Sequence, residues 1–160
     1  MTVFSHPSQL ERAARTLQLA GIDAHRISII GRCGMGDREI VGLLNDGGTC
    51  RVCGPSAPIW ERLVAVLAGT SMMFVPGLGP VIVMGPLAKA LWRTLREAPK
   101  IDRVSALGGA LMALGMPAAS VASHESALLA GQYILVVYGS RDDANKAHGI
   151  LASSSLHLMH

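Results

Sequence analysis

The stretch LVAVLAGTSMMFVPGLGPVIVMGPLA, residues 63–88, contains no Asp, Glu, Lys, Arg or His and decides how the rest of the chain is interpreted. It exceeds the ~20 apolar residues that a helix needs to span a bilayer. The residues Pro76-Gly77-Leu78-Gly79-Pro80 lie in its middle, and prolines and glycines end or bend helices. The pattern therefore predicts an apolar helical hairpin with arms at residues 63–75 and 81–95.

Each predicted arm is too short to cross a membrane alone, because about 13 helical residues measure only ~20 Å against a hydrocarbon core of ~30 Å. Trp60 and Trp92 flank the charge-free segment, and indoles at such positions are typical of membrane interfaces. Basic residues are grouped after the charge-free segment: Lys89, Arg93, Arg96, Lys100 and Arg103. These side chains suit anionic lipid headgroups. We expect the hairpin to enter and leave a membrane on one side, or to form the core of a homo-oligomer.

A further apolar helix is predicted over residues 104–116. It contains Gly108 and Gly109, small residues that permit close approach of a neighbouring helix in lipid or in an oligomer. An ordinary buried core made by all three apolar helices is the alternative.

The two ends of the chain each predict a β-α-β unit. Residues 2–5 and 26–30 have strand character and enclose an amphipathic helix that Gly21 ends. Residues 133–138 form a clear strand, Ser140 caps a helix, and residues 156–159 form a last strand. Two such units predict an α+β, ferredoxin-like sandwich with two helices on one face of a four-stranded antiparallel sheet.

Length and composition favour one composite domain. The chain has 160 residues, which suits a single domain. We divide it into a first half with its connector (1–58), the apolar insertion (59–116) and a second half (117–160). Half of the residues are hydrophobic and only 16% are charged, so part of the apolar surface is expected to face lipid or another subunit. No secretory signal peptide is visible, which predicts a cytoplasmic location, free or on the inner membrane.

The three cysteines are the main candidates for a metal site. Cys50 and Cys53 form a C-x-x-C pair and Cys33 precedes them, so their thiolates could hold zinc or another thiophilic metal if a fourth ligand joins them. Unpaired, reduced cysteines are the alternative, since an odd number of cysteines argues against a disulfide framework. The pair lies between glycines and a proline, which is not the strand-to-helix context of a redox dithiol.

Other candidate chemistry is weak. Gly31, Gly34 and Gly36 precede a possible helix at residues 37–44, but their spacing differs from phosphate-binding fingerprints and indicates a turn. The terminal His157, Met159 and His160 could hold copper, although strand alternation explains them equally well. No catalytic constellation is present, so no enzymatic activity is expected. Aromatic residues make up only 4% of the chain, which argues against a nucleic-acid partner.

Several short stretches resemble one bacterial protein family along nearly the whole chain. They are LQLAGIDAHRISIIG (17–31), Val41-Gly42 with residues 45–48, VPGLGP (75–80), GPL (85–87), ALGGAL (106–111), LGMP (114–117) and YILVVYG (133–139). In these stretches the chain resembles the bacterial general-stress proteins of the heat-induced YflT type, whose relatives are often labelled putative permeases or membrane proteins. The three cysteines depart from the family pattern.

The resemblance implies architecture and an association with membranes or stress, without a defined activity. Two hypotheses follow from the sequence. The first is a non-catalytic, membrane-associated or homo-oligomeric structural protein whose hairpin inserts or assembles within a larger complex. The alternative is a soluble metal- or redox-sensing module that uses Cys33, Cys50 and Cys53.

Overall fold

A computed structural model shows the arrangement of most of the chain. It describes residues 1–32, 42–46, 49–53, 56–67, 70–75, 77–97 and 105–156. Within residues 42–46, 49–53, 70–74 and 154–156 it describes the backbone only.

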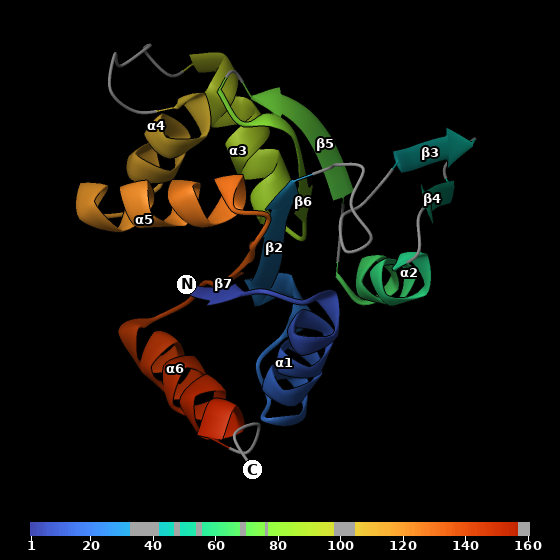
Figure 1. Cartoon of the computed structure of the whole chain (residues 1–160). Coiled ribbons are helices and arrows are strands. Elements are labelled where there is room, and N and C mark those ends of the chain that lie inside the picture. Colours follow the sequence, from blue (N-terminus) through green and yellow to red (C-terminus); the bar gives the residue numbers. More distant parts are fainter. Residues whose placement is uncertain are drawn as a thin grey trace.

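The centre of the fold is a five-stranded sheet whose neighbouring strands are all antiparallel (Figure 1). Its strands, in spatial order, are β1 (Thr2–Phe4), β7 (Tyr133–Val137), β2 (Ile27–Arg32), β6 (Gly79–Met84) and β5 (Thr70–Val75). Strand β2 is central: Ile29 lies opposite Leu135 of β7 and Met84 of β6. The predicted α+β class with an antiparallel sheet is therefore confirmed.

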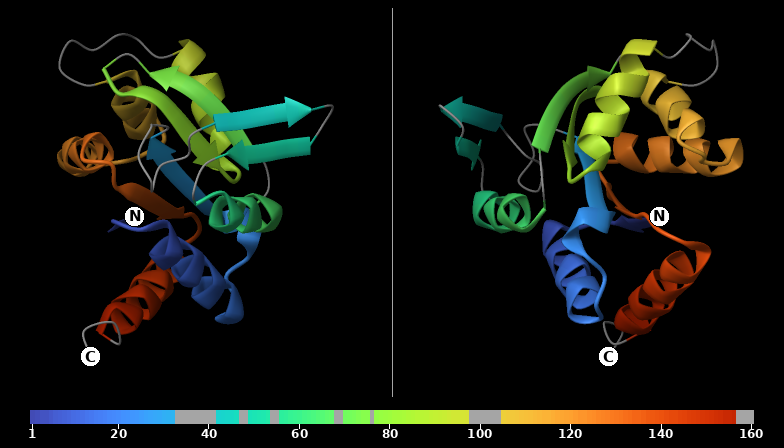
Figure 2. Two further views of the ribbon diagram at one scale, coloured as in Figure 1. Left: turned by 45° about the vertical axis from the view of Figure 1, so that its right-hand side comes forward. Right: turned by 180° about the vertical axis from the view of Figure 1, so that it is seen from behind.

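Helices cover both faces of the sheet (Figure 2), whereas the sequence predicted helices on one face. One face carries α1 (Pro7–Leu19), α2 (Ala57–Val66) and α6 (Arg141–Leu156), and the other carries α3 (Leu87–Glu97), α4 (Ala106–Ala113) and α5 (Ala118–Leu129). A short 3-10 helix, η1 (Ala24–Arg26), leads into β2. A separate two-stranded sheet pairs β3 (Gly42–Asp46) with β4 (Thr49–Cys53).

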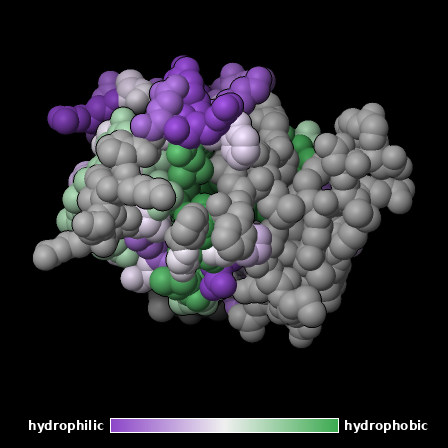
Figure 3. All heavy atoms as spheres, turned by 90° about the horizontal axis from the view of Figure 1, so that it is seen from above, coloured by the Kyte–Doolittle hydropathy of each residue, from purple (hydrophilic) through white to green (hydrophobic). Residues whose placement is uncertain are grey.

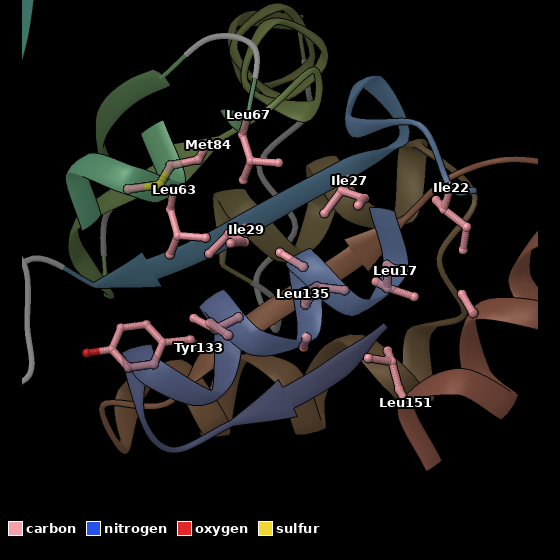
Figure 4. Packing of buried hydrophobic residues seen from close by; sticks show 14 of the residues in the cluster. Leu17, Ile22, Ile27, Ile29, Leu63, Leu67, Met84, Tyr133, Leu135 and Leu151 are labelled. Atoms are coloured by element: carbon pink, nitrogen blue, oxygen red, sulfur yellow. The ribbon is translucent and has the colours of Figure 1, made fainter. Parts of the chain in front are cut away.

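Alternation along the strands divides the core into two clusters. Ile82 and Met84 of β6 point into the cluster beneath α1, α2 and α6, while Val81 and Val83 point into the cluster beneath α3, α4 and α5. Figure 4 shows the first cluster, to which α1 contributes Leu17, α2 contributes Leu63 and β7 contributes Leu135. A strand buried on both faces needs apolar residues at every position. This explains why the sequence around residues 81–84 contains no charge.

The predicted apolar helical hairpin is wrong in its secondary structure. Within residues 63–75 the structure shows the end of α2 and strand β5. Within residues 81–95 it shows most of β6 and most of α3. The segment does turn back at the predicted place, but as a β-hairpin whose strands join the central sheet. Ile82, Val83, Phe74 and Val75 favour strands, and the sheet satisfies that preference. No described helix is long and apolar enough to cross a membrane.

The terminal units are confirmed in part. Strand β1, helix α1 and strand β2 occur where the sequence predicts a β-α-β unit. Ser140 caps α6 as predicted, because its Oγ accepts a hydrogen bond from the Asp143 N–H. The predicted last strand is wrong at Leu156, which is the final residue of α6, and residues 157–160 lie outside the described chain. The possible helix at residues 37–44 is wrong at its end, because Gly42–Asp46 is strand β3; residues 37–41 are not described.

Candidate interaction surface on the β5–β6 hairpin and helix α3

The described part of the β5–β6 turn contains Gly77, Gly79 and Pro80, which the sequence analysis singled out. Leu78 N–H donates to the Val75 carbonyl oxygen at 3.0 Å, which closes the turn. Gly77 and Gly79 have φ angles of +87° and +81°, which other residues rarely adopt. Pro80 lies opposite Phe74 in the first pairs of the ladder. Pro76 lies outside the described residues.

Trp60 does not lie at an interface, contrary to the prediction. Its side chain is only 1% exposed and belongs to the core beneath α1, α2 and α6. The indole packs against the Tyr133 ring, with centroids 5.1 Å apart and an interplanar angle of 58°. The sequence placed Trp60 just outside a helical arm, but α2 turns this position inward because Leu63 and Leu67 share the same buried side.

Trp92 is the exposed indole of the pair. Its side chain is 51% exposed on α3, while Leu87, Ala88 and Leu91 of the same helix are buried against the sheet. Lys89, Arg93 and Arg96 are also exposed. Together these residues, at positions i, i+3, i+4 and i+7, form one stripe along the outer side of α3. We call Lys89, Trp92, Arg93 and Arg96 the α3 face.

The three cations of the α3 face are not neutralised within the described chain. The ion pairs that the structure shows there involve Arg15, His25, Arg26 and Arg62 as the basic partners. Glu97 lies one turn after Arg93 on α3, but the structure shows no ion pair between these two described side chains. Figure 3, a view from above, shows strongly hydrophilic side chains gathered along one edge of the molecule.

The first turn of α3 is fixed to the sheet by a buried serine. Ser28 Oγ accepts a hydrogen bond from the Leu87 N–H at 3.1 Å, and Tyr138 Oη donates to the same oxygen at 3.2 Å. Burial raises the pKa of Tyr138 above its usual range, so the phenol stays protonated and remains a donor. Helix α3 is therefore a rigid support for its exposed residues.

The predicted close-approach glycines of the helix at residues 104–116 lie in α4. Gly108 is buried. A Cβ at Gly109 would meet nothing within 4 Å, so no neighbouring element of the described chain uses that position for close contact. Ser105 accepts from the Gly108 N–H and contacts Glu125 of α5, which joins the two helices.

Two of the three cysteines lie on β4. Cys50 pairs with Asn45 and Cys53 pairs with Gly42 across the β3–β4 ladder. Three residues of extended strand separate their Cα atoms by about 10 Å, more than the ~7 Å that a disulfide allows. Cys33 is not among the described residues, so the predicted metal site stays a prediction. The described residues contain no group of three metal-binding side chains, and the terminal His157, Met159 and His160 lie outside them.

Gly31 has a packing role that the sequence did not reveal. It lies inside β2 and is buried, and an added Cβ would meet Tyr133 Cδ1 at 2.8 Å. The glycine therefore makes room for the Tyr133 ring rather than marking a turn. Gly34 and Gly36 are outside the described residues.

Two features of this surface were missed by the sequence reasoning. The strand character of Thr70–Val75 was hidden by the length of the apolar run, although Thr, Phe and Val favour strands. The sequence analysis groups Lys89, Arg93 and Arg96 with other basic residues but does not place them with Trp92 on one helix face. The i, i+3, i+4, i+7 spacing of the α3 face was a usable signal.

Comparisons with known proteins add no relationship to this picture: no family model, curated protein or solved structure matches the chain.

Proposed function

We propose that this chain is a non-catalytic structural protein that self-associates through strand β5 of the β5–β6 hairpin. The observation that carries the proposal is the position of β5 at the end of the sheet. Among the described residues β5 pairs with β6 alone, over six consecutive residue pairs from Thr70↔Met84 to Val75↔Gly79. Its other edge pairs with no strand of the described chain, and in our proposal the backbone donors and acceptors of that edge pair with a further strand.

The sequence of β5, Thr-Ser-Met-Met-Phe-Val, lacks the features that usually protect an edge strand. It contains no charged residue and no proline, and its unbroken register with β6 shows no bulge. The opposite end of the sheet is β1, which has only three residues. Of the two ends, β5 is the one with the length to support stable pairing.

A second copy of the same chain is the partner that fits this edge. Two β5 strands that pair antiparallel about a two-fold axis perpendicular to the sheet give one continuous ten-stranded sheet. Because α3 packs against β5, this arrangement also brings the two α3 helices close together on one face of the joined sheet.

The polar side chains support the non-catalytic part of the proposal. Ser140 and Asp143 cap α6, His124 contacts the Ser120 carbonyl within α5, and Ser105 caps α4. Glu11 and Arg62 join two helices. Each of these groups has a structural task that explains its presence.

The finer fold assignment belongs to the same proposal. Strands β1 and β2 flank β7 and are parallel to each other, and α1 connects them. This arrangement supports a split β-α-β unit of the ferredoxin-like kind. Strands β5 and β6 extend it at the β2 end. The stress association, the cytoplasmic location and a place in a larger complex are also proposed; they rest on the resemblance and on sequence features.

The test is the oligomeric state of the full chain, measured by size-exclusion chromatography with light scattering over a range of concentrations. We expect a dimer for the wild type and a monomer for Met72→Lys, because the two-fold axis places the introduced charges near each other. Met72→Leu is the matched control and should remain dimeric. Thermal melts identify variants that fail to fold.

Hydrogen exchange supplies a second readout that needs no variant. The amides of residues 70–75 should become more protected as the protein concentration rises, while those of central β2 should not change. A wild-type chain that is monomeric at every concentration, with unchanged β5 protection, would show that the proposal is wrong.

A further inference from the structure

We propose that the α3 face binds anionic lipid headgroups at a membrane surface, as a peripheral contact that needs no inserted helix. The proposal is independent of the β5 pairing. It rests on an exposed indole placed between three cations on one helix that is otherwise firmly packed.

The charge of the α3 face is available for a partner. Lys89, Arg93 and Arg96 are exposed, and the ion pairs that the described residues form do not include them. Elsewhere the structure uses its exposed cations differently: Arg26 binds Asp143 at 2.7 Å and Arg62 binds Glu11 at 2.6 Å. A cluster of unneutralised cations is complementary to an anionic surface.

Trp92 favours a membrane over other anionic partners. Its ring lies in the same stripe as the cations and is 51% exposed, so it has no place in the core. Tryptophan is enriched at the level of lipid headgroups because its ring is apolar and its N–H is polar. Binding of single-stranded nucleic acid commonly uses several stacking aromatics. The α3 face offers only Trp92.

The helix has the geometry of an interfacial contact. The buried residues Leu87, Ala88 and Leu91 fix its inner side to the sheet, and the Ser28–Leu87 hydrogen bond fixes its first turn. The outer stripe from Lys89 to Arg96 is about 10 Å long, at 1.5 Å per residue. Such a helix can lie flat on headgroups with the indole at their level, without any change in the fold.

The proposal is tested by co-sedimentation of the full chain with vesicles. Vesicles of phosphatidylcholine with phosphatidylglycerol should bind the wild type, and vesicles of phosphatidylcholine alone should not. Each basic residue near an anionic surface strengthens binding about fivefold. The double charge reversal Arg93→Glu with Arg96→Glu should therefore weaken binding on the order of 25-fold or more.

A second double reversal, Arg141→Glu with Lys146→Glu on α6, is the matched control. It changes the net charge by the same amount at two other exposed positions, and should leave binding within about threefold because distant charges are screened at physiological salt. Trp92→Ala should weaken binding without changing the salt dependence. The melting temperature of every variant is checked, and all four charge positions are exposed.

Two results would overturn the proposal. One is equal loss of vesicle binding in the α3 and α6 double reversals, which would assign binding to net charge rather than to the α3 face. The other is wild-type binding to a duplex oligonucleotide, but not to anionic vesicles, that the α3 reversal abolishes. That result would assign the same cations to a nucleic acid.

Discussion

Ser28 Oγ and the Leu87 N–H form a buried hydrogen bond of 3.1 Å that joins the central strand β2 to the first turn of α3. Ser28 is completely buried, and the same oxygen accepts from Tyr138 Oη at 3.2 Å. An unpaired buried N–H costs ~1–3 kcal/mol. Ser28 is therefore required to fix the position of α3. The position of the exposed α3 face depends on it in turn.

Replacement of Ser28 should accordingly destabilise the protein more than replacement of Tyr138 by Phe. Ser28→Ala leaves the Leu87 N–H without its acceptor and should cost ~1–3 kcal/mol. Tyr138→Phe leaves that bond in place and should cost about 1 kcal/mol. Urea unfolding followed by circular dichroism measures both. Equal costs for the two variants would argue that the helix N-terminus does not depend on Ser28.

A series of glycine variants separates backbone conformation from steric clash. Gly85 has a φ angle of +95°, and an added Cβ would lie 2.4 Å from the Ile27 carbonyl oxygen and 2.6 Å from Ser28 Oγ. Gly85→Ala should therefore cost about 3 kcal/mol or more, since the unfavourable φ and the overlap both contribute. Gly77 has a similar φ with nothing near its Cβ, so Gly77→Ala should cost only ~1–2 kcal/mol.

Gly109→Ala is the control for this series. Gly109 lies inside α4, its φ is not positive, and an added Cβ meets nothing within 4 Å. Alanine should stabilise the helix by ~0.5–1 kcal/mol. Destabilisation here would reveal a close contact of the kind that the sequence predicted for Gly108 and Gly109, made by a partner subunit.

The ion pair between Glu11 of α1 and Arg62 of α2 predicts a loss of stability in acid. Arg62 Nε and NH2 donate to the two carboxylate oxygens at 2.6 and 3.0 Å, and these bonds hold the pKa of Glu11 below its ordinary value of 4.5. A carboxylate with a lowered folded pKa stabilises the protein fully above its unfolded pKa. That contribution falls as the pH decreases through the folded pKa.

The comparison of wild type with Glu11→Gln measures this contribution. At pH 7 the variant should melt about 1–4 °C lower, a small change because Arg62 is exposed to solvent. The difference should shrink as the pH falls below 4.5. A difference that stays constant down to pH 2 would contradict the assignment to the ionised carboxylate.

The two indoles predict a simple fluorescence experiment. Trp60 is 1% exposed and Trp92 is 51% exposed, so acrylamide should quench one fraction of the emission strongly and the other weakly. Trp92→Phe should remove the quenched fraction and leave the blue-shifted emission of Trp60. Anionic vesicles should protect the exposed fraction in the wild type. Protection that persists in Trp92→Phe would locate the vesicle contact elsewhere.

The sequence predicted the terminal elements well because their patterns are local. The short apolar, β-branched runs of β2 and β7, the Ser140 cap and the apolar spacing of α1 do not depend on distant residues. The central segment is different. Its apolar residues are explained by helices that cover the sheet on both faces, and a run of apolar residues does not distinguish a buried strand from a buried helix. The length of the charge-free run therefore predicted two helical arms, whereas the structure shows two strands of the covered sheet between α2 and α3.

The sequence predicted which residues belong to the candidate surfaces, but not which of them are exposed. The sequence identified the hairpin turn, Trp92 and the basic residues, but Trp60 and Trp92 look equivalent along the chain. Tertiary packing turns Trp60 towards Tyr133 and leaves Trp92 exposed. The edge position of β5 is equally invisible locally, because it depends on the order β1-β7-β2-β6-β5 across the whole sheet.

If both proposals hold, dimerisation and lipid binding should be coupled. A dimer joined through β5 presents two α3 faces on the same side of one sheet, so the second contact forms at high effective concentration. Met72→Lys should therefore bind anionic vesicles at least about tenfold more weakly than the wild type, because it loses the second contact. The added positive charge by itself would strengthen binding to anionic vesicles, so weaker binding would be explained by the loss of the dimer. Met72→Leu, which keeps the dimer, should bind like the wild type in the same co-sedimentation assay. Unchanged or tighter binding by a monomeric Met72→Lys would show that each α3 face acts alone.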